Sequence, residues 1–244
     1  MSAKGFSMYR GCCISSLMAK AAIAAAALTT LGLLAGTAIG STITILNPSF
    51  ENNTTPYPGY GAINDWSSTD TTLTGVNAEG GPFANNGAIP NGLQVAFVQS
   101  NNNVAEGISQ SLSGFVTGQT YDLSFYYNAR YATYPAAADP LMVVTLGSST
   151  LTPSGGVSVV PASASYSTTV PYYFAQYLYT ATGSTATLTF SNVKTGLDSA
   201  GTQYNDSSLL LDNVSLSSVP EPASLGLVGV GALGLLLIKR RKTA

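Results

Sequence analysis

The segment Tyr121-Asp122-Leu123-Ser124-Phe125-Tyr126-Tyr127-Asn128, residues 121–128, alternates between two kinds of side chain. One parity is apolar or aromatic and the other is more polar: Leu123, Phe125 and Tyr127 against Ser124, Tyr126 and Asn128. Successive side chains of a β-strand point to opposite faces of the sheet. The pattern therefore predicts a strand with one face in a core and a more polar face outside it.

The same period of two recurs along the middle of the chain. In residues 186–190, Ala-Thr-Leu-Thr-Phe, threonine alternates with apolar residues. Further runs typical of strands are Thr42–Leu46, Leu93–Val98, Met142–Leu146, Tyr173–Thr180 and Leu209–Leu216. Gly and Pro separate these runs, and no stretch of 41–218 has a helical period. The sequence predicts an all-β protein, with a single jelly-roll β-sandwich over residues 41–218.

Residues 52–92 follow this pattern least. They are rich in Asn, Thr, Gly and Pro, and they contain the only tryptophan, Trp66. A structureless loop of this length is unusual inside a compact domain. We therefore expect short strands near Ala62–Ser67 and Thr71–Val76.

The charges are few and segregated. Only 8% of the residues are charged, against roughly 25% in typical soluble domains. Between residues 41 and 218, two basic residues, Arg130 and Lys194, stand against ten acidic ones, a net charge of −8. A domain this acidic lacks the cations that neutralise phosphates, so we expect no nucleic-acid partner.

The predicted domain lacks the residues and motifs that most often serve in catalysis and in disulfide bonds. There is no histidine, and the only cysteines, Cys12 and Cys13, precede the first apolar run, where a lipid-attachment cysteine would not lie. The sequence has neither a phosphate-binding loop nor a Gly-x-Ser-x-Gly motif. We therefore expect no disulfide framework and no enzymatic activity.

The N-terminal 40 residues have the three parts of a secretory signal peptide. Residues 1–20 carry three basic side chains, Ala21–Leu34 is apolar, and small residues follow as far as Gly40. Cleavage is expected after Ala38 or Gly40. The alternative is an uncleaved anchor, although the apolar run is shorter than the ~20 residues that cross a bilayer.

The C-terminal 26 residues, 219–244, also have three parts. The motif Pro220-Glu221-Pro222 precedes an apolar run, Leu225–Ile238, and four basic residues, Lys239, Arg240, Arg241 and Lys242. As a helix the run would span about 21 Å, which is short for a permanent anchor. Basic residues after a transmembrane helix keep that end in the cytoplasm. An ordinary tail anchor is the alternative.

This tail resembles the PEP-CTERM sorting signal. The resemblance implies a protein exported by a bacterium, held transiently in the membrane by its C-terminal helix. An exosortase, a membrane protease-transpeptidase, would recognise the Pro-Glu-Pro motif and cleave there. The protein would then reach the cell surface or the extracellular space, often in bacteria that make exopolysaccharide.

The predicted domain resembles the jelly rolls of carbohydrate-binding-module-like, galactose-binding-type proteins. Residues 47–51, Asn-Pro-Ser-Phe-Glu, with Trp66 after them, resemble the opening motif, in which Pro48 replaces the usual glycine. Residues 108–125 resemble the central strand pair, and residues 211–216 the closing strand.

The resemblance implies one candidate cation site, because the first and last strands of such modules lie together and carboxylates there often hold a structural calcium ion. Glu51 and Asp212 are the candidate ligands. Asp212 shares its parity with Leu210, Val214 and Leu216, an unusual face for a charge unless it is paired. The alternative is an Asp212 that caps a bulge and a solvated Glu51. No other cofactor is expected.

Tyr126, Asn128 and Arg130 share one predicted strand face and are the candidate ligand-binding residues for a sugar. The alternative is an ordinary polar sheet face. A second tyrosine group, Tyr173, Tyr177 and Tyr179, shares one parity of its strand, so we expect it to pack in the core or line the sheet rather than bind a sugar.

These observations predict an exported bacterial surface or matrix protein, non-enzymatic and associated with exopolysaccharide. One alternative is a dedicated glycan-binding module. The other is a polysaccharide hydrolase, which would need a pair of carboxylates.

Overall fold

The protein is an all-β sandwich in the computed structural model, which describes residues 42–53, 59–81, 86–100, 105–130, 139–163, 167–194 and 207–220. These residues form 14 strands and no helix, which confirms the predicted fold class. The predicted signal peptide and C-terminal helix lie outside the described residues. Within the described ranges, no helix has the length and hydropathy needed to cross a membrane.

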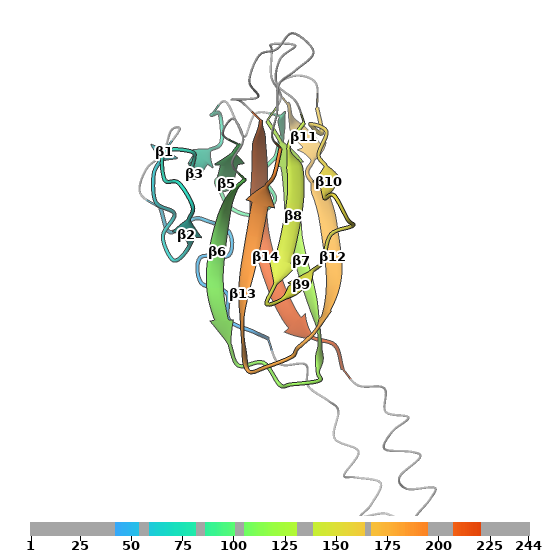
Figure 1. Cartoon of the computed structure of the whole chain (residues 1–244). Coiled ribbons are helices and arrows are strands. Elements are labelled where there is room, and N and C mark those ends of the chain that lie inside the picture. Colours follow the sequence, from blue (N-terminus) through green and yellow to red (C-terminus); the bar gives the residue numbers. More distant parts are fainter. Residues whose placement is uncertain are drawn as a thin grey trace, which may run out of the picture. The chain divides into compact units, whose positions relative to one another are not determined.

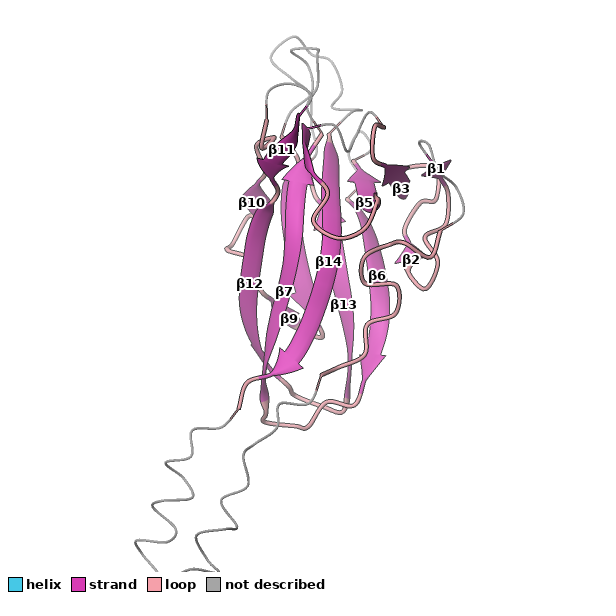
Figure 2. Cartoon of the chain, turned by 180° about the vertical axis from the view of Figure 1, so that it is seen from behind, coloured by secondary structure: helices cyan, strands magenta, loops and turns pink. Residues whose placement is uncertain are grey.

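Two antiparallel sheets face each other (Figures 1 and 2). The first sheet has the order β1-β3-β5-β14-β7-β12, with the bounds β1 (Gly59–Tyr60), β3 (Thr74–Ala78), β5 (Gln94–Gln99), β14 (Ser208–Ser218), β7 (Thr120–Ala129) and β12 (Tyr173–Thr180). The second has the order β10-β8-β13-β6-β2, with the bounds β10 (Val157–Ser158), β8 (Leu141–Leu146), β13 (Thr185–Asn192), β6 (Glu106–Ser113) and β2 (Ser67–Ser68).

Three short strands complete the structure. β9 (Ser149–Thr150) pairs with β8 beside the second sheet. β4 (Asn86–Ala88) and β11 (Ser167–Pro171) form a separate parallel pair. All the described strands belong to one compact unit, Gly40–Val219, which contains both buried apolar clusters and so has a core of its own.

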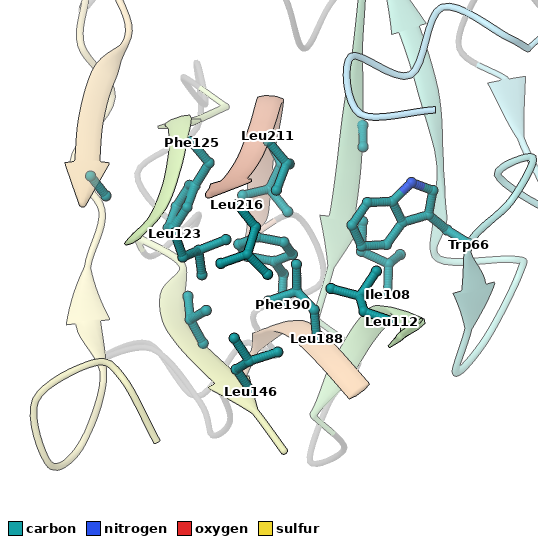
Figure 3. Close-up of a cluster of buried hydrophobic side chains, with 14 of the residues drawn as sticks. Trp66, Ile108, Leu112, Leu123, Phe125, Leu146, Leu188, Phe190, Leu211 and Leu216 are labelled. Carbon is teal, nitrogen blue, oxygen red and sulfur yellow. The ribbon is translucent and has the colours of Figure 1, made fainter. Parts of the chain in front are cut away.

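The main core lies between the two sheets and is made by alternate residues of the long strands (Figure 3). Phe125 of β7 meets Phe190 of β13 edge to face, with their ring centroids 4.8 Å apart. Trp66, which precedes β2, lies with its ring centroid 6.1 Å from that of Phe190. The alternation found in the sequence is therefore the alternation between core and surface, as predicted.

One predicted strand does not form. Thr42–Leu46 makes only an isolated bridge, between Thr42 and Ser217 of β14. The backbone amide and carbonyl of Leu46 are bonded instead to the side-chain amide of Gln110, each at 2.9 Å. A side chain thus takes the hydrogen bonds that a neighbouring strand would have made.

A β-bulge changes the expected face of Asp212. The register of β14 against β7 shifts between Asp212 and Ser215, and Asn213 at the bulge has a φ of +50°. Leu211 and Val214, on either side of the bulge, both point into the main core. The expectation that Asp212 shares a face with Val214 and Leu216 was therefore wrong, because an extra residue at a bulge reverses the parity of the strand after it.

Candidate functional site

The outer face of the first sheet has a covered half and an open half. β4, β11 and their flanking segments cover one half and enclose a second, smaller apolar cluster: Val95, Phe97, Tyr172 and Leu210. Gly87 of β4 lies flat on the Tyr172 ring, since an added Cβ would come within 2.7 Å of that ring. Tyr172 joins β11 to β12, so the covering segment is anchored directly to the edge of the sheet.

Asp212 lies fully buried beneath this covered half. Its Oδ2 accepts a hydrogen bond from the Asn91 backbone amide, and its Oδ1 accepts one from the Asn213 amide, both at 2.7 Å. Burial raises the pKa of Asp212 to about 7, against the two hydrogen bonds, which lower it. The charge of Glu51 raises this pKa further, which indicates that the two carboxylates are near each other.

The Tyr172 hydroxyl lies near Asp212. Burial raises the pKa of Tyr172, and the charge of Asp212 adds to the effect. The hydroxyl is buried without a hydrogen bond from the described residues, although the Asn128 side chain is close to it.

Glu51 and Asp212 hold the same loop, residues 91–94. Oε1 of Glu51 accepts hydrogen bonds from the amides of Leu93, at 2.8 Å, and Gln94, at 2.7 Å. Gly92, which precedes Leu93, has a φ of +75°, and a Cβ there would come within 2.4 Å of the Glu51 carboxyl group. Glycine is therefore required at this position. The structure brings together the two residues that the sequence singled out, but the described residues contain no group of three His, Cys, Asp or Glu side chains around them.

The predicted ligand-binding residues divide between the two halves. Asn128 is fully buried, and its Oδ1 accepts hydrogen bonds from the amides of Ala129 and Ala162, both at 2.8 Å. Asn128 therefore does not lie on an exposed face with Tyr126, because the chain near β11 covers it. Arg130 is half-buried just beyond the end of β7, and its amide donates to the carbonyl of Ser208. Tyr126 is half-buried: it packs against the apolar cluster of the covered half and borders the open half.

Tyr126 has a partner that the sequence reasoning missed. Phe174 of β12 lies directly across from Tyr126 in the ladder, and the centroids of the two rings are 5.2 Å apart. The Phe174 side chain is 54% exposed. The sequence did indicate that Phe174 faces outward. Phe174, Gln176 and Leu178 alternate with the group Tyr173, Tyr177 and Tyr179, so they lie on the opposite face of the strand. Of that group, Tyr179 is buried and Tyr177 half-buried, as predicted, whereas Tyr173 is exposed at the margin.

The remaining residues around this aromatic pair are mostly neutral and polar. Gln176 donates a hydrogen bond from its side-chain amide to Oδ2 of Asp122, whose Oδ1 accepts none from the described residues. We define the open face by the outward residues of three neighbouring strands: Asp122, Ser124, Tyr126, Phe174, Gln176, Leu178, Ser215 and Ser217. It combines two ring surfaces with amide, hydroxyl and carboxylate groups, an arrangement that can stack on a ligand and hydrogen-bond to it.

Solved structures with a similar fold include TmCBM61 in complex with β-1,4-galactotriose, at 12% identity and a TM-score of 0.45, covering 74% of this chain and 100% of that chain. The CBM22-1 xylan-binding domain of Paenibacillus barcinonensis Xyn10C has 17% identity and a TM-score of 0.38, with 71% and 93% covered. The K2 cleaved adhesin domain of Lys-gingipain has 16% identity and a TM-score of 0.41, with 73% and 97% covered. No curated protein sequence matches the chain.

Two family models match the sequence itself. Residues 218–242 match the PEP-CTERM protein-sorting motif, which confirms the sorting signal read from the tail. That motif is typical of exported proteins that are sorted to the cell envelope and processed by an exosortase. Residues 41–217, well over half of the chain, match the model described as HpiC1 cyclase. The protein is therefore a member of the HpiC1-like family that carries a PEP-CTERM sorting motif at its C-terminus.

Proposed function

We propose that this envelope-sorted protein is a non-enzymatic glycan-binding protein of the exopolysaccharide matrix, and that the open face is its binding surface. The observation that supports this proposal is a pair of neighbouring rings on the outer sheet face, the exposed Phe174 and the half-buried Tyr126. Aromatic side chains offer a large apolar contact surface, and the apolar C–H faces of a sugar ring can stack on it. Gln176, Asp122 and the serines beside them supply hydrogen bonds to sugar hydroxyls.

The charge of the domain limits the class of glycan. Residues 41–218 carry a net charge of −8, and Asp122 is the only charged residue of the open face. An acidic domain repels an acidic polymer, and a face with a single carboxylate offers little charge to pair with a cationic one. The proposed ligand is therefore a neutral polysaccharide.

The environment of Asp212 favours binding over catalysis. The family description names a cyclase, and in this chain Asp212 is a fully buried carboxyl group that could serve such a reaction as a proton donor. Its two oxygens accept hydrogen bonds from the Asn91 and Asn213 amides, and it has no exposed surface. A substrate would reach it only after the 91–94 loop had moved, whereas the open face is accessible without such a change.

We expect substitution of either ring to weaken glycan binding. Tyr126→Ala and Phe174→Ala should each raise the Kd for a neutral glycan found on an array by about tenfold or more, because aromatic residues at the centre of a binding site contribute most of the binding energy. Calorimetry on the Gly40–Val219 unit would measure this change. Val116→Ala, which shortens an exposed apolar side chain away from the open face, is the control.

Two outcomes would contradict the proposal. One is the absence of binding to every neutral glycan on the array. The other is turnover of a glycan that disappears in Asp212→Asn, which would replace binding by catalysis at the covered half.

We also propose that Glu51 and Asp212 hold a structural calcium ion. Two neighbouring carboxylates suit this ion, which takes six to eight oxygen ligands. Oε2 of Glu51 makes no hydrogen bond with the described residues, whereas Oε1 is used by the loop. Backbone carbonyl or amide oxygens would have to complete the ligand set.

Calcium should stabilise the folded domain. At one hundred times its Kd, a ligand that binds only the folded state adds about 2.7 kcal/mol, which corresponds to a rise in Tm of roughly 5–10 °C for a domain of this size. Thermal melts with calcium and with a chelator measure the effect. Glu51→Gln keeps an oxygen for the Leu93 and Gln94 amides but loses the charge, so its melt should not respond to calcium. A wild-type Tm that is the same with calcium and with chelator would rule out the site.

A further inference from the structure

The four outer edges of the two sheets are not alike. Three of them end in strands of only two residues: β1 in the first sheet, and β10 and β2 in the second. Very short edge strands are a common protection against pairing with another chain. The fourth edge, β12, has eight residues, and no described residue pairs with its far side. Figure 1 shows β12 running along the margin of the sandwich.

β12 also lacks the other usual protections of an edge. Its sequence, Tyr-Phe-Ala-Gln-Tyr-Leu-Tyr-Thr, contains no charged residue and no proline, and its register against β7 is continuous over all eight residues. Three of its large apolar side chains are exposed: Tyr173 at 40%, Phe174 at 54% and Leu178 at 67%. A long, regular, apolar edge of this kind is a template for strand pairing.

The backbone of β12 indicates which residues would make the new hydrogen bonds. The Ala181 amide donates to the Gln119 carbonyl, one step beyond the last pair of the β12–β7 ladder. Hydrogen-bonded pairs alternate along an antiparallel ladder. The odd-numbered residues therefore bond to β7, and the even-numbered residues, Gln176 among them, direct their amides and carbonyls to the free edge.

We propose that β12 pairs antiparallel with β12 of a second copy of this chain, about a two-fold axis at Gln176. This register places Gln176 opposite the same residue of the second copy, where the two outward amides and carbonyls can bond reciprocally. It also places Phe174 opposite Leu178 of the other copy, on the same outer face, twice by symmetry. The pattern Phe-x-Gln-x-Leu is self-complementary about its centre, as a two-fold interface requires.

Charge on the strand itself does not oppose a second copy at this edge. The domain has a net charge of −8, so two copies repel each other over most approaches. β12 contributes no charge of its own to the contact. A two-fold pairing uses up both free edges and closes the assembly as a dimer rather than a fibre.

The dimer would join two first sheets into one continuous sheet of twelve strands, with both open faces on the same side. Pairing at the edge leaves the outer faces of Phe174 and Tyr126 accessible, so it is compatible with the proposed function but does not depend on it. Dimerisation is measured without a glycan, so its outcome is independent of the binding experiment.

Substitutions at Gln176 test the proposed axis directly. Sedimentation equilibrium of the Gly40–Val219 unit should give a dimer for the wild type. Gln176→Lys and Gln176→Glu should each raise the dimer Kd by about tenfold or more, because each places like charges opposite each other across the axis. An equimolar mixture of the two variants should form a dimer with one chain of each kind, identified by native mass spectrometry and weakened by salt.

Val116→Lys and Val116→Glu, which place the same charges at an exposed site away from β12, should leave the dimer unchanged. Circular dichroism confirms that each variant is folded. A wild-type protein that is monomeric at every concentration overturns the proposal. So does a dimer that Gln176→Lys leaves unaffected, or a mixture that does not recover dimerisation.

Discussion

Replacing Phe190 by alanine is expected to lower the free energy of unfolding by about 3–5 kcal/mol. Phe190 is fully buried between the sheets, and its ring contacts Phe125 edge to face and lies beside Trp66. These residues come from β13, β7 and the segment before β2, so the cavity would open where three distant parts of the chain meet (Figure 3). Little of it could close, because β13 and β7 are each held by hydrogen-bonded strands on both sides.

Urea denaturation of the Gly40–Val219 unit, followed by the fluorescence of Trp66, measures this loss. The matched control is Phe174→Ala, which removes the same ring from an exposed position and should cost less than about 1 kcal/mol. Equal losses for the two variants would mean that Phe190 does not occupy the core described here.

The second large effect concerns the tail. Replacing Pro220, Glu221 and Pro222 together by alanine should abolish processing, because an exosortase that reads this motif would no longer recognise the chain. The apolar run and the four basic residues would remain, so the protein should accumulate in the membrane fraction with its full C-terminus. Mass spectrometry of the membrane, surface and extracellular fractions from the native host measures both the mass and the location.

A second variant separates recognition from retention. Deleting residues 220–244 removes both the motif and the apolar run, so this chain should leave the cell without passing through a membrane-bound form. A motif variant that is processed like the wild type would contradict exosortase recognition at Pro-Glu-Pro. A wild-type surface protein that still carries residues 225–244 would favour the ordinary tail anchor.

Strand positions could largely be predicted from the sequence, because the alternation of apolar and polar residues is a local property. The strand predicted over Tyr173–Thr180 has those same bounds in the structure, and the one predicted over residues 186–190 lies within β13. The sorting tail was readable for a related reason, since its recognition depends on a linear motif. The Thr42–Leu46 prediction failed because Gln110, more than sixty positions away in the chain, takes the backbone bonds of Leu46.

The candidate site was predictable only in part. Glu51 and Asp212 were identified together, and they do hold one loop. The burial of Asn128 was not predictable, because the cover comes from β4, β11 and the Ala162 amide. Phe174 was overlooked as a partner of Tyr126 because the pairing of β12 with β7 is a property of the sheet order, which alternation does not encode.

The alternation in residues 121–128 and its repeats by itself determined the class of fold, since a period of two can bury one face only in a sheet. The sequence also determined the destination of the protein, through a tail that is read in linear form. Only the tertiary structure decided which surfaces are usable. The bulge at Asn213 turned Asp212 to the outer face, a distant segment buried it there, and the strand order left β12 as a long free edge. The physical reason is that burial and edges arise from contacts between segments far apart in the chain, which no local pattern specifies.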